Sequence, residues 1–317
     1  MLANKALLVH LGISQWTGRR LDKRATGTVE ASHATQKHVG NFTKKLLPGA
    51  KELEKINALA GALRKFFYLN TLPWLADGTR IISSKNYLEF TGQFRTKKQE
   101  FEDAVSEFLR VYPALVIEAR MKLGDLFSGA EYPTAARLES CFRCEISFLP
   151  MPSVEDFRTE MLDSEKNEFL SRMRDVEAEA VRDCWNRLHS VVSKAAERLA
   201  DPNANFRESL LENISEVCAL LPKLNITEDA ELESARQSVE SAISAVTASQ
   251  LKSSATDRES TAAALKAIES KMGIFLGVQS SQAEDAQVIA ARLGGAKFEG
   301  SQGTNLADGI IITKGVV

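Results

Sequence analysis

The chain has 317 residues, 44% of them hydrophobic and 26% charged, which is enough for one large or two modest domains with a hydrophobic core. Its formal net charge is only −2, which excludes a global field that would commit the whole protein to nucleic acid or membrane. Four cysteines are too few for a disulfide framework, and no apolar run approaches bilayer-spanning length, so the sequence predicts a cytoplasmic protein.

The N-terminal part is expected to form a small antiparallel or mixed sheet. Stretches at 5–13, 79–83 and 141–149 are apolar or alternate in polarity, which is typical of strands. Residues 15–29 fit a loop or another strand, and residues 30–47 fit a poorly patterned helix.

Long helices are expected to cover this sheet. Residues 51–69 place leucines and phenylalanines on one helical face, and residues 88–124 repeat large apolar residues seven apart. Pro113 predicts a kink in the second of these helices. The stripe over 164–200 is long enough to pair with 88–124 as an antiparallel hairpin. Further helices are expected near 205–221, 228–251 and 257–276. The fold class is therefore α+β, predominantly α-helical, with a helical C-terminal half.

The chain is predicted to have three parts: an α+β domain at 1–157, a helical bundle or coiled-coil region at 158–293, and a glycine-rich tail at 294–317. The tail contains an isolated apolar triplet with the character of a strand tip. A tip of this kind predicts pairing with a sheet edge, either in its own chain or in a neighbouring subunit, and the alternative is a disordered tail. The self-association candidates are Ile310, Ile311 and Ile312.

The sequence lacks the common motifs for catalysis and metal binding. No phosphate-binding P-loop, dinucleotide fingerprint, zinc-protease motif or nucleophile elbow occurs. Cys141 and Cys144 lie three apart on a predicted strand, so they point to opposite faces and are wrong for one metal ion. We therefore predict a non-enzymatic protein with no catalytic residues, no metal and no cofactor.

The positive charge is concentrated near the N-terminus. Residues 1–51 hold nine Lys and Arg against two acidic residues, so their net charge is +7 and the rest of the chain carries −9. Clustered cations bind phosphates with release of counterions, and an aromatic ring among them can stack on an unpaired base. The nucleic-acid-binding candidates are Trp16, Arg19, Arg20, Lys23, Arg24, Lys37, Lys44 and Lys45. The alternative is that this charge complements the acidic helical body, in the same chain or in the next subunit.

An ordered set of short motifs covers most of the N-terminal half. The motifs are Ile13-Ser14-Gln15-Trp16, Leu72-Pro73-Trp74, Asp77-Gly78-Thr79-Arg80-Ile81, Asn86-Tyr87, Tyr112-Pro113-Ala114-Leu115, Leu123-Gly124-Asp125-Leu126-Phe127, Tyr132-Pro133, Phe148-Leu149-Pro150-Met151-Pro152 and Asp156-Phe157-Arg158. The set resembles a family of phage and prophage proteins catalogued as domain of unknown function 3150. The resemblance implies a phage or related bacterial-island protein in the host cytoplasm, encoded beside a MoxR-type AAA+ ATPase. It assigns no catalytic residues.

These observations predict a non-enzymatic phage protein that associates with DNA, single-stranded more than double-stranded, and self-assembles into a homo-oligomer. The basic N-terminal region would contact the phosphates. One alternative is an adaptor or structural partner of the MoxR-type AAA+ ATPase. Another is an oligomeric assembly protein that does not bind nucleic acid. No membrane partner is expected.

Overall fold

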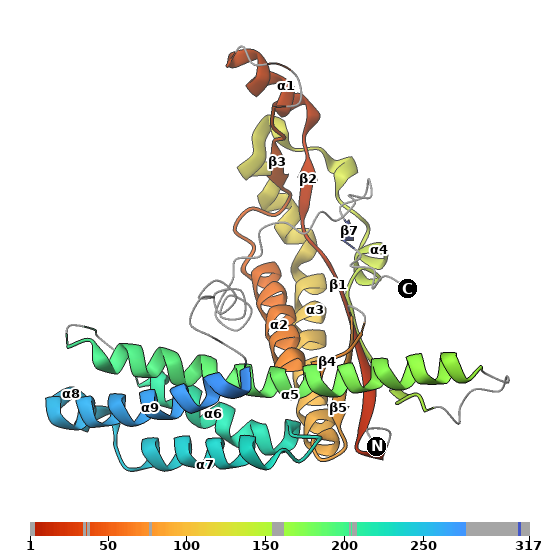
Figure 1. Cartoon of the computed structure of the whole chain (residues 1–317). Helices are drawn as coiled ribbons and strands as arrows, with labels where there is room; N and C mark the ends of the chain where they lie inside the picture. Colours follow the sequence, from red (N-terminus) through yellow and green to blue (C-terminus); the bar gives the residue numbers. More distant parts are fainter. Residues whose placement is uncertain are drawn as a thin grey trace. The chain divides into compact units, whose positions relative to one another are not determined.

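The computed structural model describes residues 4–33, 36, 39–75, 78–153, 162–202, 204, 208–276 and 310–311. The fold is α+β and mostly α-helical, which confirms the predicted class (Figure 1). The elements in chain order are β1 (Ala6–Trp16), β2 (Arg19–Leu21), α1 (Lys23–Ser32), β3 (Thr43–Lys45), α2 (Lys51–Leu69), β4 (Leu72–Pro73), β5 (Thr79–Ser83), α3 (Tyr87–Leu123), the 3-10 turns η2 (Gly124–Leu126) and η3 (Gly129–Glu131), α4 (Ala135–Glu139), β6 (Arg143–Pro150), α5 (Asp163–Ala200), α6 (Ser209–Leu224), α7 (Ala230–Ser244), α8 (Ala248–Ser253), α9 (Ala255–Leu276) and β7 (Ile310–Ile311).

The main sheet is built on β1. This strand pairs antiparallel with β5, with Ala6 opposite Ser83 and His10 opposite Thr79. β5 pairs antiparallel with β4, and the strand order is β4-β5-β1-β6. The strands predicted from polarity patterns are thus confirmed as β1, β5 and β6.

The strand tip predicted in the tail pairs within its own chain. Ile310 lies opposite Trp16 and Ile311 opposite Gln15, in antiparallel register with the end of β1. Ile312 lies outside the described residues. An exchange of this strand between subunits stays a prediction.

Contacts between Cα atoms divide the chain into two compact units. The unit that we call the bundle unit comprises 1–10, 68–90 and 148–297. The unit that we call the ribbon unit comprises 11–67, 91–147 and 298–317. The predicted division into three parts stays a prediction.

Helix α5 is the centre of the bundle unit. The apolar stripe of α5 is buried from Val176 to Leu199, and α5 packs chiefly on α9, with α6 and α7 as further neighbours. The predicted hairpin of 164–200 with 88–124 is therefore wrong. A periodic stripe shows which face of a helix is buried, and the helices that follow α5 along the chain are the ones that cover it.

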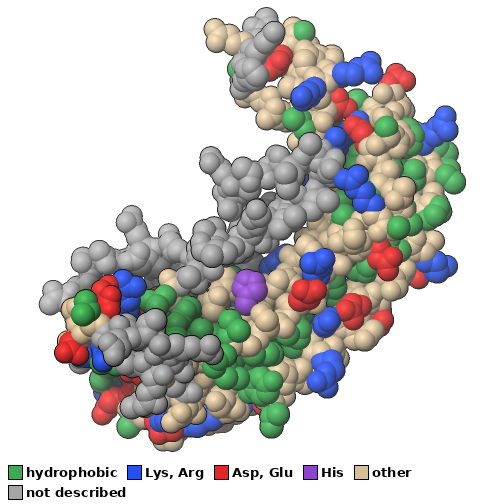
Figure 2. Space-filling view, turned by 90° about the vertical axis from the view of Figure 1, so that its right-hand side faces the viewer, with side chains coloured by type: hydrophobic (Ala, Val, Ile, Leu, Met, Phe, Trp, Pro, Cys, Tyr) green, Lys and Arg blue, Asp and Glu red, His purple; other side chains and the backbone are tan. Residues whose placement is uncertain are grey.

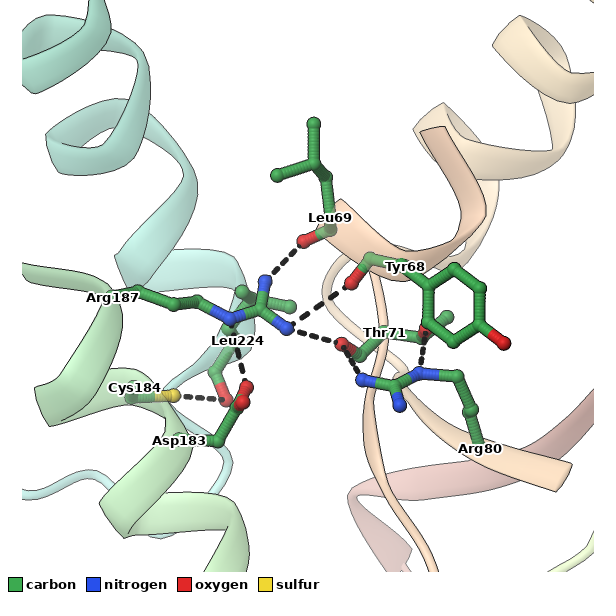
Figure 3. Close-up of polar contacts among 8 residues, drawn as sticks. All are labelled: Tyr68, Leu69, Thr71, Arg80, Asp183, Cys184, Arg187 and Leu224. Atoms are coloured by element: carbon green, nitrogen blue, oxygen red, sulfur yellow. Dashed lines mark hydrogen bonds and ion pairs between the residues drawn. The ribbon is translucent and has the colours of Figure 1, made fainter. Parts of the chain in front are cut away.

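A buried arginine closes the end of α2. The last carbonyls of a helix have no donor within the helix. Arg187 of α5, only 7% exposed, donates to Leu69 O at 2.5 Å, Tyr68 O at 3.1 Å and Thr71 O at 2.7 Å (Figure 3). Its Nε donates to Asp183 Oδ2 at 2.7 Å. One guanidinium therefore supplies donors to three carbonyls and is neutralised by a carboxylate.

Two other arginines act in a similar way in the same unit. Arg80 donates to the hydroxyl of Thr71 at 2.7 Å and lies over the ring of Tyr68, 4.9 Å from its centroid. Arg258 of α9 donates to the carbonyls of Leu199 at 3.1 Å and Ala204 at 3.0 Å, where α5 ends. Arg258 thus caps the end of α5, and Arg80 holds Thr71 just after the end of α2.

In the ribbon unit, the aromatic stripe of α3 forms much of the core. Phe94, Phe101 and Phe108 are all buried, as their spacing of seven predicts. α3 continues through Pro113, and the kink expected there stays a prediction. No helix among the described residues has both the length and the hydropathy that crossing a bilayer requires.

Candidate nucleic-acid interface

Strands β2 and β3 form a two-stranded antiparallel ribbon with α1 between them in sequence. Arg19 lies opposite Lys45, and Arg20 lies opposite Lys44. Side chains alternate between the two faces of a strand. Arg19 and Lys45 therefore share one face of the ribbon, which we call the outer face, and Arg20 and Lys44 share the other, the inner face. This structure replaces the helix predicted over 30–47.

Lys44 anchors the inner face. Its side chain is 5% exposed, and its Nζ lies 2.9 Å from Asp22 Oδ2 and 2.8 Å from Glu131 Oε2. Nζ also donates to Leu126 O at 2.6 Å. Because these three groups use its charge and its donors, Lys44 does not belong to the predicted phosphate-binding set. It holds the ribbon against the segment 124–131.

Asp22 serves both this anchor and helix α1. Its Oδ1 accepts the amide of Ala25 at 3.0 Å and so caps the helix. The hydrogen bond from Ala25, followed by that from Lys44, lowers the pKa of the Asp22 carboxyl. Burial lowers the pKa of the Lys44 ammonium, but the interactions with Glu131 and Asp22 together outweigh burial and raise it. Both groups are therefore charged at neutral pH.

Replacing Lys44 by methionine is expected to loosen the ribbon at neutral pH, because Asp22 and Glu131 then face each other without a cation.

In the native protein, the low pKa of Asp22 stabilises the fold above its ordinary pKa of 3.8, and this contribution is lost as the pH falls through the lower folded value. The high pKa of Lys44 stabilises the fold below 10.5, and this contribution is lost as the pH rises through the higher folded value.

Amide hydrogen exchange of β2 and β3 at pH 7 measures this effect. Lys51→Met is the matched control, because it removes an exposed lysine outside the ribbon and leaves the anchor intact. Equal protection in Lys44→Met and the native protein would contradict an anchoring role for Lys44.

Four of the remaining cations of the ribbon and of the first turn of α1 are exposed. Arg20 is half-buried, and Lys37 lies outside the described residues. Asp22, the one acidic residue in 19–26 and 43–45, already pairs with Lys44. The exposed members, which we call the basic cluster, are Arg19, Lys23, Arg24 and Lys45.

Trp16 does not join the basic cluster. Its side chain is 2% exposed, and its ring centroid lies 6.3 Å from that of Phe108 and 6.2 Å from that of Tyr112. A ring in this position belongs to the core and has no face for a nucleic-acid base. The prediction that Trp16 stacks on a base is therefore wrong.

Phe42, an aromatic residue outside the predicted binding set, lies beside the ribbon. Phe42 is 38% exposed, and its backbone is fixed on both sides. Its carbonyl accepts the amide of Asp22 at 2.9 Å, and its amide donates to Thr26 Oγ1 at 2.9 Å. The signal in the sequence is its position just before Lys44 and Lys45. It is the aromatic side chain that the ribbon itself presents to solvent.

Apolar side chains are also exposed around the ribbon. Helix α1 buries no residue, and Leu21, Val29 and Val39 are 42%, 49% and 68% exposed. This surface therefore combines positive charge with apolar area.

The basic cluster is a local feature. On the face drawn in Figure 2, Lys and Arg side chains alternate with Asp and Glu side chains, so no basic field covers that face. Within the described residues, no group of three or more His, Cys, Asp or Glu side chains is placed to hold a metal ion. What the site offers chemically is the binding of anions.

Comparison with known proteins identifies no relative of this chain. The chain matches no family model, no curated protein and no solved structure. The resemblance to the phage family stays a prediction.

Proposed function

We propose that this protein binds nucleic acid without acting as an enzyme, and that the basic cluster contacts the phosphates. The observation that carries the proposal is that the two faces of the ribbon hold cations in different environments. Lys44 is buried and neutralised on the inner face, whereas Arg19 and Lys45 are exposed on the outer face. Lys23 and Arg24 add two exposed charges at the start of α1.

We propose single-stranded nucleic acid as the preferred ligand. Proteins that bind single strands combine a positive surface with exposed aromatic rings on which bases stack. Phe42 supports this preference because its side chain is exposed while its backbone is hydrogen-bonded on both sides. Assembly into a homo-oligomer, a phage origin and a place in the host cytoplasm belong to the same proposal and depend on the resemblance.

A second candidate partner is an acidic protein surface. The exposed apolar residues Leu21, Val29 and Val39 favour it, because protein interfaces bury apolar area and nucleic-acid phosphates do not. The negatively charged remainder of the chain in another subunit would fit, and so would a MoxR-type AAA+ ATPase.

Replacing the basic cluster by glutamine is expected to flatten the salt dependence of DNA binding. For single strands, the slope of log K against log salt is about −0.7 per phosphate contact, so the loss of three or four contacts changes it by about 2 to 3. The measurement is fluorescence anisotropy of a 5′-labelled oligonucleotide across a salt series. The matched control replaces two arginines and two lysines that are exposed in the bundle unit: Arg174, Arg182, Lys194 and Lys252.

The two sets of variants separate the candidates. A slope that changes only in the basic-cluster variant supports nucleic-acid binding. Equal slopes in both variants contradict it. A third outcome is that the native protein does not bind DNA and that the mass measured by light scattering falls only in the basic-cluster variant. This outcome would favour a second copy of the chain as the partner.

A further inference from the structure

The two outer-face cations occupy the closest kind of cross-strand position. In an antiparallel pair, hydrogen-bonded positions alternate with non-hydrogen-bonded ones, and side chains approach more closely at the latter. The amide of Leu46 donates to Gly18 O at 2.7 Å, which makes 18 and 46 a hydrogen-bonded pair. Arg19 and Lys45, one step along, are therefore a non-hydrogen-bonded pair with Cα atoms about 4.5 Å apart.

The other end of the ribbon shows the same alternation of hydrogen-bonded and non-hydrogen-bonded pairs. The amide of Asp22 donates to Phe42 O at 2.9 Å, so 22 and 42 are again a hydrogen-bonded pair. Arg20 and Lys44 fall between these ends at a hydrogen-bonded position in the register. The assignment of Arg19 and Lys45 to the close position therefore rests on two independent hydrogen bonds.

Two like charges at this position disfavour the ribbon. Like charges directly opposite on a sheet destabilise the pairing. On the inner face, Asp22 and Glu131 compensate the charge of Lys44 at 2.9 and 2.8 Å. The outer face has no acidic residue on either strand to do the same for Arg19 and Lys45. Within the described residues, no ion pair joins either cation to a carboxylate, so the ribbon places two like charges together on its exposed face.

We propose that Arg19 and Lys45 act as a clamp for one phosphate group and that its binding stabilises the ribbon. The planar guanidinium of Arg19 presents paired donors that match two phosphate oxygens, and the ammonium of Lys45 adds a point charge. A ligand that binds only the folded ribbon shifts its equilibrium toward the folded form. This inference rests on the proposed function, since it takes the backbone phosphate of nucleic acid as the ligand. Free inorganic phosphate shares the same chemistry.

Lys45→Glu separates the effect of the clamp on stability from its effect on binding. It places a carboxylate opposite Arg19 and turns repulsion into attraction. We expect amides of β2 and β3 to exchange about 1.5 to 5 times more slowly than in the native protein without ligand. The same variant should show no further protection when phosphate is added. Lys51→Glu, at an exposed lysine outside the ribbon, is the control and should behave as the native protein.

The experiment is hydrogen exchange on the full chain at constant ionic strength, with sodium chloride, inorganic phosphate or an oligonucleotide added. Slower exchange of the native ribbon with phosphate, absent in Lys45→Glu, supports the clamp. If the oligonucleotide binds but Lys45→Glu neither gains protection nor loses affinity, the clamp is overturned and the proposed function survives. Protection by inorganic phosphate without oligonucleotide binding supports the clamp and removes nucleic acid as its ligand. Protection by neither overturns the clamp.

Discussion

Arg187→Ala is expected to lower the free energy of unfolding of the bundle unit by about 3–5 kcal/mol, because each buried acceptor that loses its donor costs about 1–3 kcal/mol. The guanidinium is buried and donates to the carbonyls of Tyr68, Leu69 and Thr71. Alanine removes the arginine donor from the carbonyls of Tyr68 and Leu69, leaves Thr71 O with the donor from Arg80, and leaves Asp183 without its cation. Urea unfolding followed by circular dichroism measures the change.

Two further variants test whether the geometry or only the charge of Arg187 matters. Arg187→Lys keeps the charge, but one ammonium cannot reproduce the planar fork that reaches all three carbonyls, so most of the loss should remain. Arg172→Ala removes another arginine of α5 that forms an i,i+4 pair with Glu168 and is 63% exposed. Its effect should stay within about 0.5 kcal/mol. Full stability in Arg187→Lys would contradict the capping role and leave charge alone as the cause.

The sequence predicted those parts of the fold that depend on local periodicity. The helices expected at 88–124 and 164–200 are observed as Tyr87–Leu123 and Asp163–Ala200. Their packing was not predictable in the same way, because an apolar stripe identifies the buried face of a helix and does not identify the element that packs on that face. α5 packs on α9, which is separated from it by three helices in the chain. The buried Arg187 gave no signal either, since an arginine in a helical pattern is normally a solvent-exposed residue.

Charge composition located the basic region but did not show which of its cations are available. Lys44 and Lys45 are adjacent and identical in type, yet one is buried between two carboxylates and the other is exposed. Strand alternation separates them, and it becomes visible only once 43–45 is known to be a strand paired with 19–21. The charge of Glu131 at Lys44 comes from a segment 87 positions away in the sequence, a contact that no local pattern predicts.

Trp16→Ala is expected to destabilise the ribbon unit by about 3–5 kcal/mol, the range for removing a large aromatic side chain from a core. The ring is 2% exposed and packs near Phe108 and Tyr112, so alanine leaves a cavity among aromatic neighbours. Thermal unfolding measures the loss. Trp16→Phe keeps most of the volume and should retain the fold at a smaller cost. If Trp16 serves only the core, the Trp16→Phe protein should bind a labelled oligonucleotide within about twofold of the native affinity, a difference of only about 0.4 kcal/mol.

Phe42→Ala, which removes an exposed ring, should instead weaken binding to single strands by about 1–3 kcal/mol and leave thermal stability nearly unchanged. A folded Trp16→Phe protein that loses binding while Phe42→Ala retains it would reverse the roles of the two rings.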